Sequence, residues 1–130
     1  MRQESRLTKP AQFALVYRQG RSWSSGPLVL RAMPNGLPVT RCGFSVSRRI
    51  GNAVTRNRVK RWLREIMRGE SVTAGYDIVL IARMAAPEAG FAGVKAAAAG
   101  LLARAKLIAR PDGRSSEIGV GTVADTGRIE

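Results

Sequence analysis

Seven consecutive residues, Tyr76 to Ala82, constrain the fold more than any other part of this 130-residue sequence. The run Tyr-Asp-Ile-Val-Leu-Ile-Ala is nearly all apolar and lacks the alternation of polar and apolar residues that a half-exposed strand shows. Such a run is typical of a central strand that is covered on much of both faces. The chain therefore has to supply a layer on each side of a sheet, and its length suits one domain of that kind.

Three helical segments can supply these layers. The first runs from about Lys9 to Gln19, with Thr8 as a candidate N-cap. The second runs from about Ala53 to Met67. The third is rich in alanine and runs from Pro87 to about Ala109, and Pro111 prevents its continuation.

Two more strands are predicted before the second helix. The segment Leu28 to Met33 has the composition of a strand, and Val39 to Ser47 alternates in polarity. In the second strand one face is expected to join the core through Cys42, Phe44 and Val46. The other face is small and polar, and it carries Arg41, Gly43, Ser45 and Ser47.

The connections complete a prediction of the fold. Residues 34–38 contain an Asn-Gly pair that favours a tight hairpin reversal, and residues 21–26 are polar and end in glycine, which favours a loop. The resulting order, α-β-β-α-β-α, predicts a single-domain α+β sandwich of a small sheet with helices. We expect one domain at residues 1–110 and a flexible C-terminal tail at 111–130, which is rich in Gly, Ser and Thr.

The charge of the chain indicates a polyanionic partner. Twenty-two Lys and Arg residues face nine Asp and Glu residues, which leaves a net charge of +13. Such an excess opposes folding by self-repulsion and is typical of proteins that bind nucleic acid. No segment has the roughly 20 apolar residues that span a bilayer, and no apolar signal sequence follows Met1. The sequence therefore predicts a cytoplasmic protein with a nucleic acid partner and no membrane partner.

The side chains that enzymes commonly use are scarce. The chain contains no histidine and one cysteine, Cys42, so it has no candidate for an imidazole base, a disulfide or a zinc finger. Its nine acids are scattered, with none of the close clusters that bind two metal ions. We therefore predict no catalytic residue and no metal site in the polypeptide itself.

Much of the positive charge lies in one segment, Arg41 to Arg68, which holds nine Lys and Arg residues against the single acid Glu65. On the second helix, Val59, Trp62, Leu63 and Ile66 form an apolar stripe. The opposite arc is cationic and carries Asn57, Lys60, Arg61, Arg64 and Arg68, with Arg56 at its border. A merely solvated helix face usually interleaves acids with bases, and the near absence of acids here favours binding to phosphates.

Four side chains have a structural and a functional interpretation. Asn52 can be an N-cap, whereas Asn57 lies inside the helix, where asparagine is unfavourable and could bond either RNA or a neighbouring loop. Phe13 and Tyr17 share one face of the first helix. They can be core residues, or they can form a stacking platform for single-stranded bases if this helix lies across the Gly43 face.

The run from Arg41 to Glu65 resembles the signature of the protein subunit of bacterial ribonuclease P. The resemblance is strongest at Gly-Asn-Ala-Val (51–54) followed by Arg-Asn-Arg (56–58), and it extends with weaker features from about Arg6 to Ala105. This sequence has Tyr17 where phenylalanine is frequent, and arginines where lysines are frequent at 48 and 49. The resemblance implies an α+β sandwich with a left-handed β-α-β crossover, against the usual right-handed preference.

The resemblance also implies a function. Proteins of this family assist a catalytic RNA that removes the 5′ leader of precursor tRNA by magnesium-dependent hydrolysis, and the RNA holds most of the Mg2+. The residues expected to bind the catalytic RNA are Arg48, Arg49, Asn52, Arg56, Asn57, Arg58, Lys60, Arg61, Arg64 and Arg68. Those expected in the cleft for the single-stranded leader are Phe13, Tyr17, Arg41, Ser45 and Ser47.

Two other functions remain open from the residues alone. A structural RNA-binding protein, such as a ribosomal subunit, would have the same composition and the same basic helix. A nuclease that works without RNA is disfavoured because the chain lacks histidine and a cluster of acids.

Overall fold

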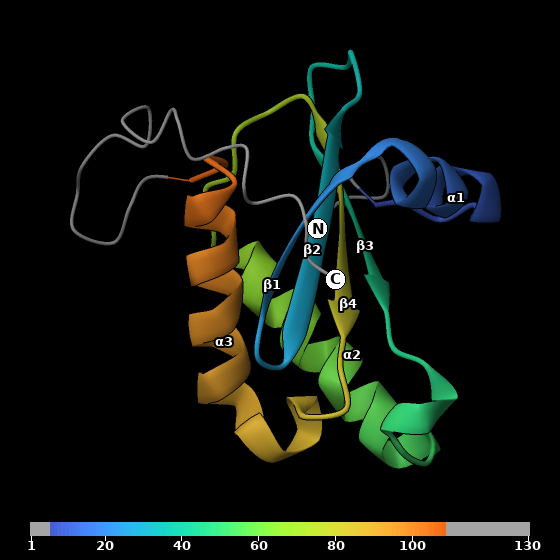
Figure 1. Ribbon diagram of the computed structural model, residues 1–130, viewed down its shortest axis with the longest axis vertical. Coiled ribbons are helices and arrows are strands. Elements are labelled where there is room, and N and C mark those ends of the chain that lie inside the picture. Colours follow the sequence, from blue (N-terminus) through green and yellow to red (C-terminus); the bar gives the residue numbers. More distant parts are fainter. Residues whose placement is uncertain (1–5, 109–130) are drawn as a thin grey trace.

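The computed structural model describes residues 6–108, which form a four-stranded sheet with helices on both faces (Figure 1). Its elements are α1 (Pro10–Gln19), β1 (Arg21–Ser25), β2 (Leu28–Pro34), β3 (Arg41–Ser45), the short 3-10 helix η2 (Arg48–Ile50), α2 (Ala53–Arg68), β4 (Tyr76–Ala82) and α3 (Ala86–Arg104). The predicted α+β class is confirmed, and the predicted elements occur in the predicted order. No helix within residues 6–108 is long and apolar enough to span a bilayer.

The apolar run that forms β4 is a central strand, as predicted. The strand order is β1-β2-β4-β3, so β4 has a neighbour on each side. It runs antiparallel to β2 and parallel to β3. Successive side chains at Ile78, Val79 and Leu80 are completely buried although they point to opposite faces. Both faces of the strand are therefore covered at this point.

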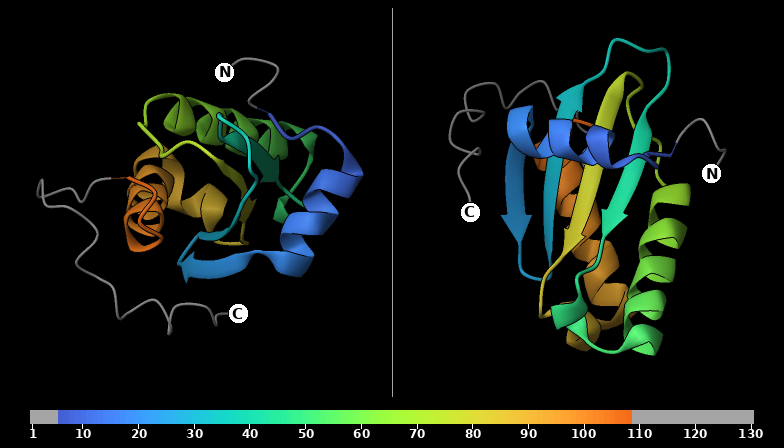
Figure 2. Two further views of the ribbon diagram at one scale, coloured as in Figure 1. Left: turned by 90° about the horizontal axis from the view of Figure 1, so that it is seen from above. Right: turned by 90° about the vertical axis from the view of Figure 1, so that its right-hand side faces the viewer.

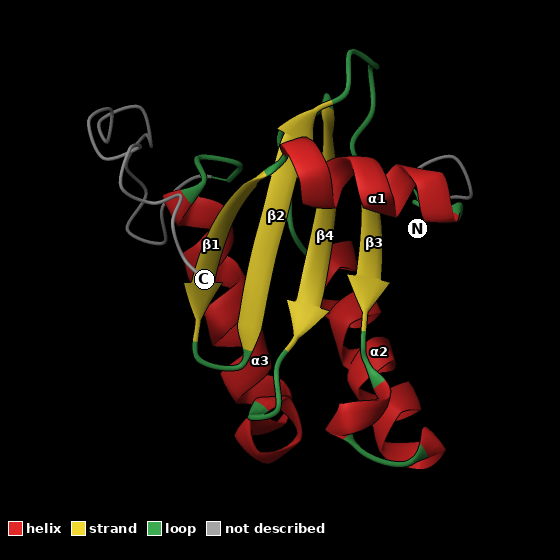
Figure 3. Ribbon diagram, turned by 45° about the vertical axis from the view of Figure 1, so that its right-hand side comes forward, coloured by secondary structure: helices red, strands yellow, loops and turns green. Residues whose placement is uncertain are grey.

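The connection from β3 through α2 to β4 is left-handed. In Figure 3, β3 and β4 both run downward, α2 lies behind the sheet, and β4 is to the left of β3. A right-handed connection behind a sheet in this orientation would place β4 on the right. The expectation from the family resemblance is confirmed, and α2 lies beside the free edge of β3.

Two apolar layers hold the helices on the sheet. On one face α1 crosses the strands and packs through Val16 and Phe13 against Val79, with Leu7 in the same cluster. On the other face the sheet is covered by α2 and α3 (Figure 2). Between them lies a larger core, to which Leu63 and Leu101 contribute. The apolar stripe predicted for α2 is buried at Val59, Leu63 and Ile66, and Trp62 packs partly buried beside it.

Two predictions about the sheet are wrong. Residues 21–26 are not a loop, because Arg21–Ser25 forms the edge strand β1 and pairs with β2. The reversal at residues 34–38 does not join hairpin partners either, because β4 lies between β2 and β3. The hairpin of the fold is β1-β2, which turns at Gly26 with a φ of 46°. The strand predicted at Val39 to Ser47 does form, but it is shorter than expected, since β3 spans Arg41–Ser45.

Several helix boundaries also differ from prediction. The N-cap of α1 is Lys9 rather than Thr8, and the side-chain oxygen of Gln12 accepts hydrogen bonds from both backbone amides. Helix α3 is kinked at Gly90, where φ is 73°, and Phe91 next to the kink is 38% exposed. It ends at Arg104, earlier than predicted. The proposed domain boundary at 110 and the tail 111–130 lie outside the described residues.

Candidate functional site

The outer face of α2 carries the cations that the sequence analysis assigned to RNA. Arg58 and Arg61 are exposed, whereas Arg56, Lys60 and Arg64 are half-buried. Within residues 6–108 the only acid paired with a cation of this helix is Glu65, whose carboxylate is 3.7 Å from Arg68 Nη1. Both partners are more than half exposed, so solvent screens the pair strongly. The face therefore keeps most of its positive charge available to a polyanion.

Local hydrogen bonds fix the segment that leads into α2. Ser47 caps η2, and its hydroxyl accepts a hydrogen bond from the Arg49 amide at 3.3 Å. The side-chain oxygen of Asn52 accepts from the Thr55 amide at 2.9 Å, so Asn52 is the N-cap of α2. Arg56 Nη1 donates to the Gly51 carbonyl at 2.8 Å. Three predicted RNA-binding or leader-binding positions, 47, 52 and 56, thus have structural bonds of their own.

Arg58 and Asn57, also on α2, make no hydrogen bond of this kind to the chain that leads into the helix. The guanidinium of Arg58 lies over the Trp62 ring, 5.8 Å from its centroid, which orients the cation along the helix surface. Asn57 is exposed, and its side chain has no hydrogen-bond partner in the part of the chain that the structure describes. A polar side chain that gains no internal bond in a helix favours the functional interpretation of Asn57 over the structural one.

On the opposite face of the sheet, α1 makes close contact with β3. A Cβ atom at Gly43 would lie 2.6 Å from Cζ of Phe13, so the aromatic ring rests directly on the glycine backbone. Phe13 is partly buried in the same cluster as Val16 and Leu7. This position is compatible with a core residue and with a stacking surface for a base. Tyr17 is 40% exposed and does not belong to the core.

A hollow of about 150 Å3 opens at the free edge of β3, between α1 and α2. Phe13 and Gly43 line it from one side, and Lys60 and Arg64 line it from the other. The structure therefore brings together one member of the predicted leader cleft and two members of the predicted catalytic RNA set. The other predicted cleft residues do not line this hollow; they are Tyr17, Arg41, Ser45 and Ser47.

Arg41 forms a buried ion pair at the start of β3. Its Nε and Nη2 donate to the two oxygens of Asp77 at 2.8 and 2.7 Å, and Asn35 Nδ2 adds a third bond at 2.9 Å. Burial disfavours the charged carboxylate, but the bonds from Arg41 and Asn35 and the charge of Arg41 outweigh it and lower the pKa of Asp77. Arg41 thus has a structural role, and its place in the leader cleft stays a prediction.

One cation on the α1 face of the sheet was missed by the sequence analysis. Arg31 Nη2 donates to the backbone carbonyls of Tyr17 and Gly20 at the end of α1, and Arg31 Nε is buried without a partner among the described residues. The signal was present in the sequence, because strand alternation places Arg31 opposite to Leu30 and Ala32. Arg31 holds the C-terminal end of α1 on the sheet.

Fold and site together define a class: a small, basic α+β protein whose cationic helix lies in a left-handed crossover beside an aromatic hollow. The family model described as Ribonuclease P matches residues 1–106. The chain is 40% identical over 122 residues to the ribonuclease P protein component of Roseiflexus sp. (strain RS-1), covering 92% of this chain and 100% of that protein. It is 36% identical to the ribonuclease P protein component of Dehalococcoides mccartyi (strain CBDB1), covering 89% and 97%. The chain belongs to the ribonuclease P protein family.

Solved structures agree with this assignment. A mutant of the Staphylococcus aureus RNase P protein, described as defective in mRNA degradation activity, superimposes with a TM-score of 0.76 at 33% identity. This match covers 81% of the present chain and 91% of that protein. The RNase P protein from Thermotoga maritima gives a TM-score of 0.69 at 34% identity and covers 75% and 94%.

Proposed function

We propose that this protein is the subunit of a ribonuclease P in which a catalytic RNA removes the 5′ leader of precursor tRNA. Membership of the family supports a role in tRNA processing through RNA. The observation that carries the finer proposal is the hollow at the β3 edge, which is lined by Phe13 together with Lys60 and Arg64. A ring beside cations suits an unpaired base and its phosphate, which is the chemistry of a single-stranded leader.

The proposal divides the protein surface between two RNAs. The exposed arc of α2, with Arg58 and Arg61 at its centre, binds phosphates of the catalytic RNA. The hollow beside Phe13 binds the leader, and Lys60 and Arg64 lie where the two surfaces meet. A leader placed there remains next to the catalytic RNA, so the protein orients the substrate for cleavage.

The catalytic RNA, in this proposal, also holds the Mg2+ ions of the reaction, which supply the activated water. Within residues 6–108, no group of three or more acidic, cysteine or histidine side chains gathers in a form that could hold a metal ion. The part of the protein is then to neutralise phosphates and to position the leader. Its cations lower the repulsion between catalytic RNA and precursor tRNA, a role that is most valuable when magnesium is scarce.

Reconstitution with the catalytic RNA tests the function. At a low magnesium concentration that does not support the RNA alone, adding the protein is expected to restore cleavage of a precursor tRNA with its leader. Failure to restore cleavage, with RNA binding intact, would favour the alternative of a structural RNA-binding protein such as a ribosomal subunit. Cleavage by the protein without RNA would point instead to a nuclease.

The leader site has a sharper test at Phe13. Phe13→Leu keeps apolar contact with Gly43 but removes the stacking surface, so we expect it to weaken binding of leader-bearing precursor by about 1–3 kcal/mol. Binding of mature tRNA, which has no leader, should hardly change. Val16→Ala is the matched control, because Val16 is fully buried in the same cluster and does not line the hollow. If both variants weaken both RNAs equally, Phe13 acts only as a core residue.

A further inference from the structure

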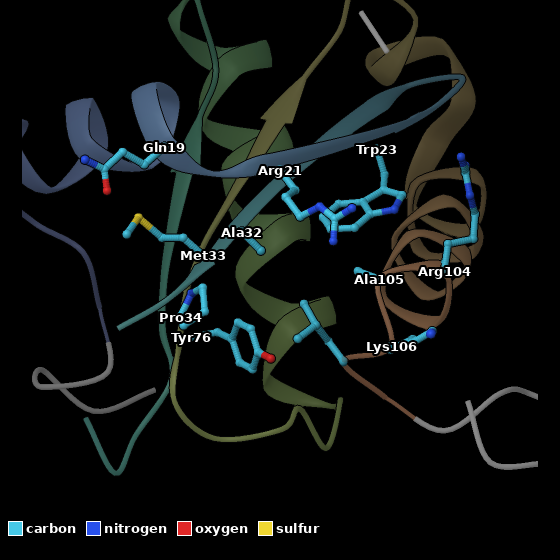
Figure 4. Close-up of a pocket in the computed structure, with 11 residues that line it drawn as sticks. Gln19, Arg21, Trp23, Ala32, Met33, Pro34, Tyr76, Arg104, Ala105 and Lys106 are labelled. Carbon is cyan, nitrogen blue, oxygen red and sulfur yellow. The ribbon is translucent and has the colours of Figure 1, made fainter. Parts of the chain in front are cut away.

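A second cavity, larger than the hollow beside Phe13, lies next to β1, at the edge of the sheet opposite to β3. It has a volume of about 340 Å3 and opens between the sheet and the C-terminal end of α3 (Figure 4). Trp23 of β1 and Tyr76 at the start of β4 contribute its aromatic walls. None of its lining residues is shared with the hollow beside Phe13. Its size falls within the range of sites that bind small molecules or single nucleotides.

Trp23 lines this cavity and has a buried polar group without a partner within residues 6–108. The residue is 6% exposed, and its indole Nε1 has no hydrogen-bond partner among the described residues. Figure 4 shows the indole beside Arg21, with Ala105 near it at the end of α3. An indole nitrogen can only donate, and buried donors without an acceptor are rare in folded proteins. The nitrogen is itself buried, so a ligand that carries an acceptor, such as a carbonyl or a ring nitrogen, bonds to it only when the wall of the cavity adjusts.

The charge of the cavity selects an anion. Arg104 and Lys106 line it, and no carboxylate does so among the residues that the structure describes. Arg104 is held at the mouth because its Nη1 donates to the backbone carbonyl of Ser24 at 2.9 Å. Cations around aromatic walls are the arrangement that binds a phosphate and its base together.

Lys106 has a backbone conformation that is unfavourable for lysine. Its φ is 63°, the left-handed region, which glycine adopts without strain. The amides of Lys106 and Leu107 donate to the carbonyls of Ala103 and Leu102, the hydrogen-bond pattern of a Schellman motif whose left-handed position is usually glycine. A strained residue at a cavity indicates that its side chain serves binding rather than stability.

We propose that this cavity binds one unpaired nucleotide of a single-stranded RNA. The base would lie against Trp23 and Tyr76 and, as the cavity wall adjusts, accept a hydrogen bond from the Trp23 indole N–H. Lys106 and Arg104 would contact the adjoining phosphates. This inference goes beyond the proposed function, because it assigns a site on the side of the sheet away from β3 and α2. A free nucleoside monophosphate shares the same chemistry, and the experiment below separates the two sources.

The indole N–H itself reports binding. We would titrate the full-length 15N-labelled protein with hexauridylate and, separately, with uridine 5′-monophosphate, and follow the Trp23 indole signal, which Trp23→Phe assigns. Hexauridylate is expected to move this signal downfield in a saturable way, and the monophosphate should bind about tenfold more weakly because it lacks neighbouring phosphates. Phe13→Leu should leave this titration unchanged, which separates the cavity from the leader site.

Variants at Lys106 then test the strained cation. Lys106→Asn tolerates the left-handed conformation without charge, so it should weaken hexauridylate binding about three- to tenfold and reduce the salt slope by about 0.7. Lys106→Gly should lose the same affinity while raising Tm by about 3 °C. Lys95→Ala removes an equal charge from an exposed position on α3 that does not line the cavity, and should change affinity less than about twofold.

Four results would overturn the proposal. The Trp23 signal could stay fixed at millimolar hexauridylate, or Lys106→Gly could gain stability and keep full affinity. Equal affinity for the monophosphate and the hexanucleotide would show a site for free nucleotides rather than for a strand. A Trp23 signal that moves, without RNA, when the chain is shortened to end at residue 108 would show that the protein's own C-terminal segment fills the cavity.

Discussion

Asp77 is the one charged residue in the apolar run of β4, and its environment explains how a central strand tolerates it. The carboxylate is 3% exposed and accepts two hydrogen bonds from Arg41 and one from Asn35. The strand register places Arg41 directly opposite Asp77, which makes the pair possible. The negative charge of Asp77 also acts on the neighbouring thiol of Cys42. Burial of this thiol is the larger cause, and the Asp77 charge the smaller one, of a rise in the pKa of Cys42 to about 12. The lone thiol is therefore protonated and unreactive at neutral pH.

The Asp77 pair predicts a specific dependence of stability on pH. The pKa of Asp77 is lower in the folded protein than its ordinary value of 3.8, so its stabilising contribution is complete above that value. The contribution is lost as the pH falls through the folded pKa. Asp77→Asn should remove this dependence and cost about 2–3 kcal/mol at pH 7, because Arg41 loses its partner. Urea unfolding between pH 2.5 and 7 measures both.

A control for this experiment is Glu65→Gln, which breaks the exposed pair with Arg68 and should cost less than about 0.5 kcal/mol. If Asp77→Asn retains the acid sensitivity of the original protein, other carboxylates cause it. In that case the ion pair at the start of β3 has no part in acid unfolding.

At the scale of elements, α2 shows how one helix combines a structural and a binding role. Its buried residues lie on one side, and its exposed cations, among them Arg58 and Arg61, lie on another, whereas Lys60 and Arg64 are half-buried beside the hollow at the β3 edge. The N-terminal turn is held by the hydrogen bonds of the Asn52 and Arg56 side chains, whereas Arg58 is held, among residues 6–108, only by its contact with Trp62. Arg56 and Arg58, two residues apart, should therefore respond differently to mutation.

Arg58→Ala should weaken binding to the catalytic RNA and lower the slope of log affinity against log salt by about one phosphate contact, with little loss of stability. Arg56→Ala should reduce the stability of the protein as well, by about 1 kcal/mol, because the Gly51 carbonyl loses its donor. Lys95→Ala, on α3, is the control with equal charge loss. An unchanged salt slope for Arg58→Ala would mean that this arginine does not contact phosphate.

Some elements could be predicted from sequence and others could not. Two elements can be recognised from local sequence. Burial on both faces gives β4 its continuous apolar run, and burial on one side gives α2 its apolar stripe. Strand β1 has no such pattern: Ser22 and Trp23 are buried only because β2 and α3 lie next to them. The position of β4 between β2 and β3 was equally hidden, since a hairpin fitted the residues as well.

The candidate site divides in the same way. A charge excess in one segment is visible in composition, so the cations of α2 were predicted. The partners of Arg41, Arg31 and Arg56 depend on contacts that only the folded chain creates. The cavity next to β1 joins Trp23 to Arg104, and the bond between Arg104 and Ser24 spans 80 residues. Sequence spacing contains no signal for such a site.

At the scale of the whole molecule, repulsion between like charges is the dominant electrostatic effect. The net charge is +13, and two ion pairs between side chains, Arg41–Asp77 and Arg68–Glu65, occur among the described residues. Salt therefore screens more repulsion than attraction. The free protein should be more stable at moderate ionic strength than at low ionic strength, in contrast to its binding to RNA, which salt weakens.

Thermal unfolding in KCl measures this effect. Raising KCl from about 20 to 200 mM, a range that shortens the Debye length to about 10 Å or less, should increase Tm by a few degrees. Arg61→Glu reverses an exposed charge of α2, lowers the net charge from +13 to +11, and should flatten the dependence. A Tm that falls with KCl would show that favourable pairs outweigh the repulsion.

The position of β4 also has a consequence for the order in which the protein can be made. The ribosome synthesises β3 and α2 before β4, yet β3 has no bonds to β2 and meets the sheet only through β4. Until residue 82 has emerged, the apolar side of α2 has no completed sheet to cover. The nascent chain thus carries a strongly basic amphipathic helix beside ribosomal RNA while its own core is unfinished. Folding of this small protein is therefore expected to wait for β4, whatever the speed of the earlier steps.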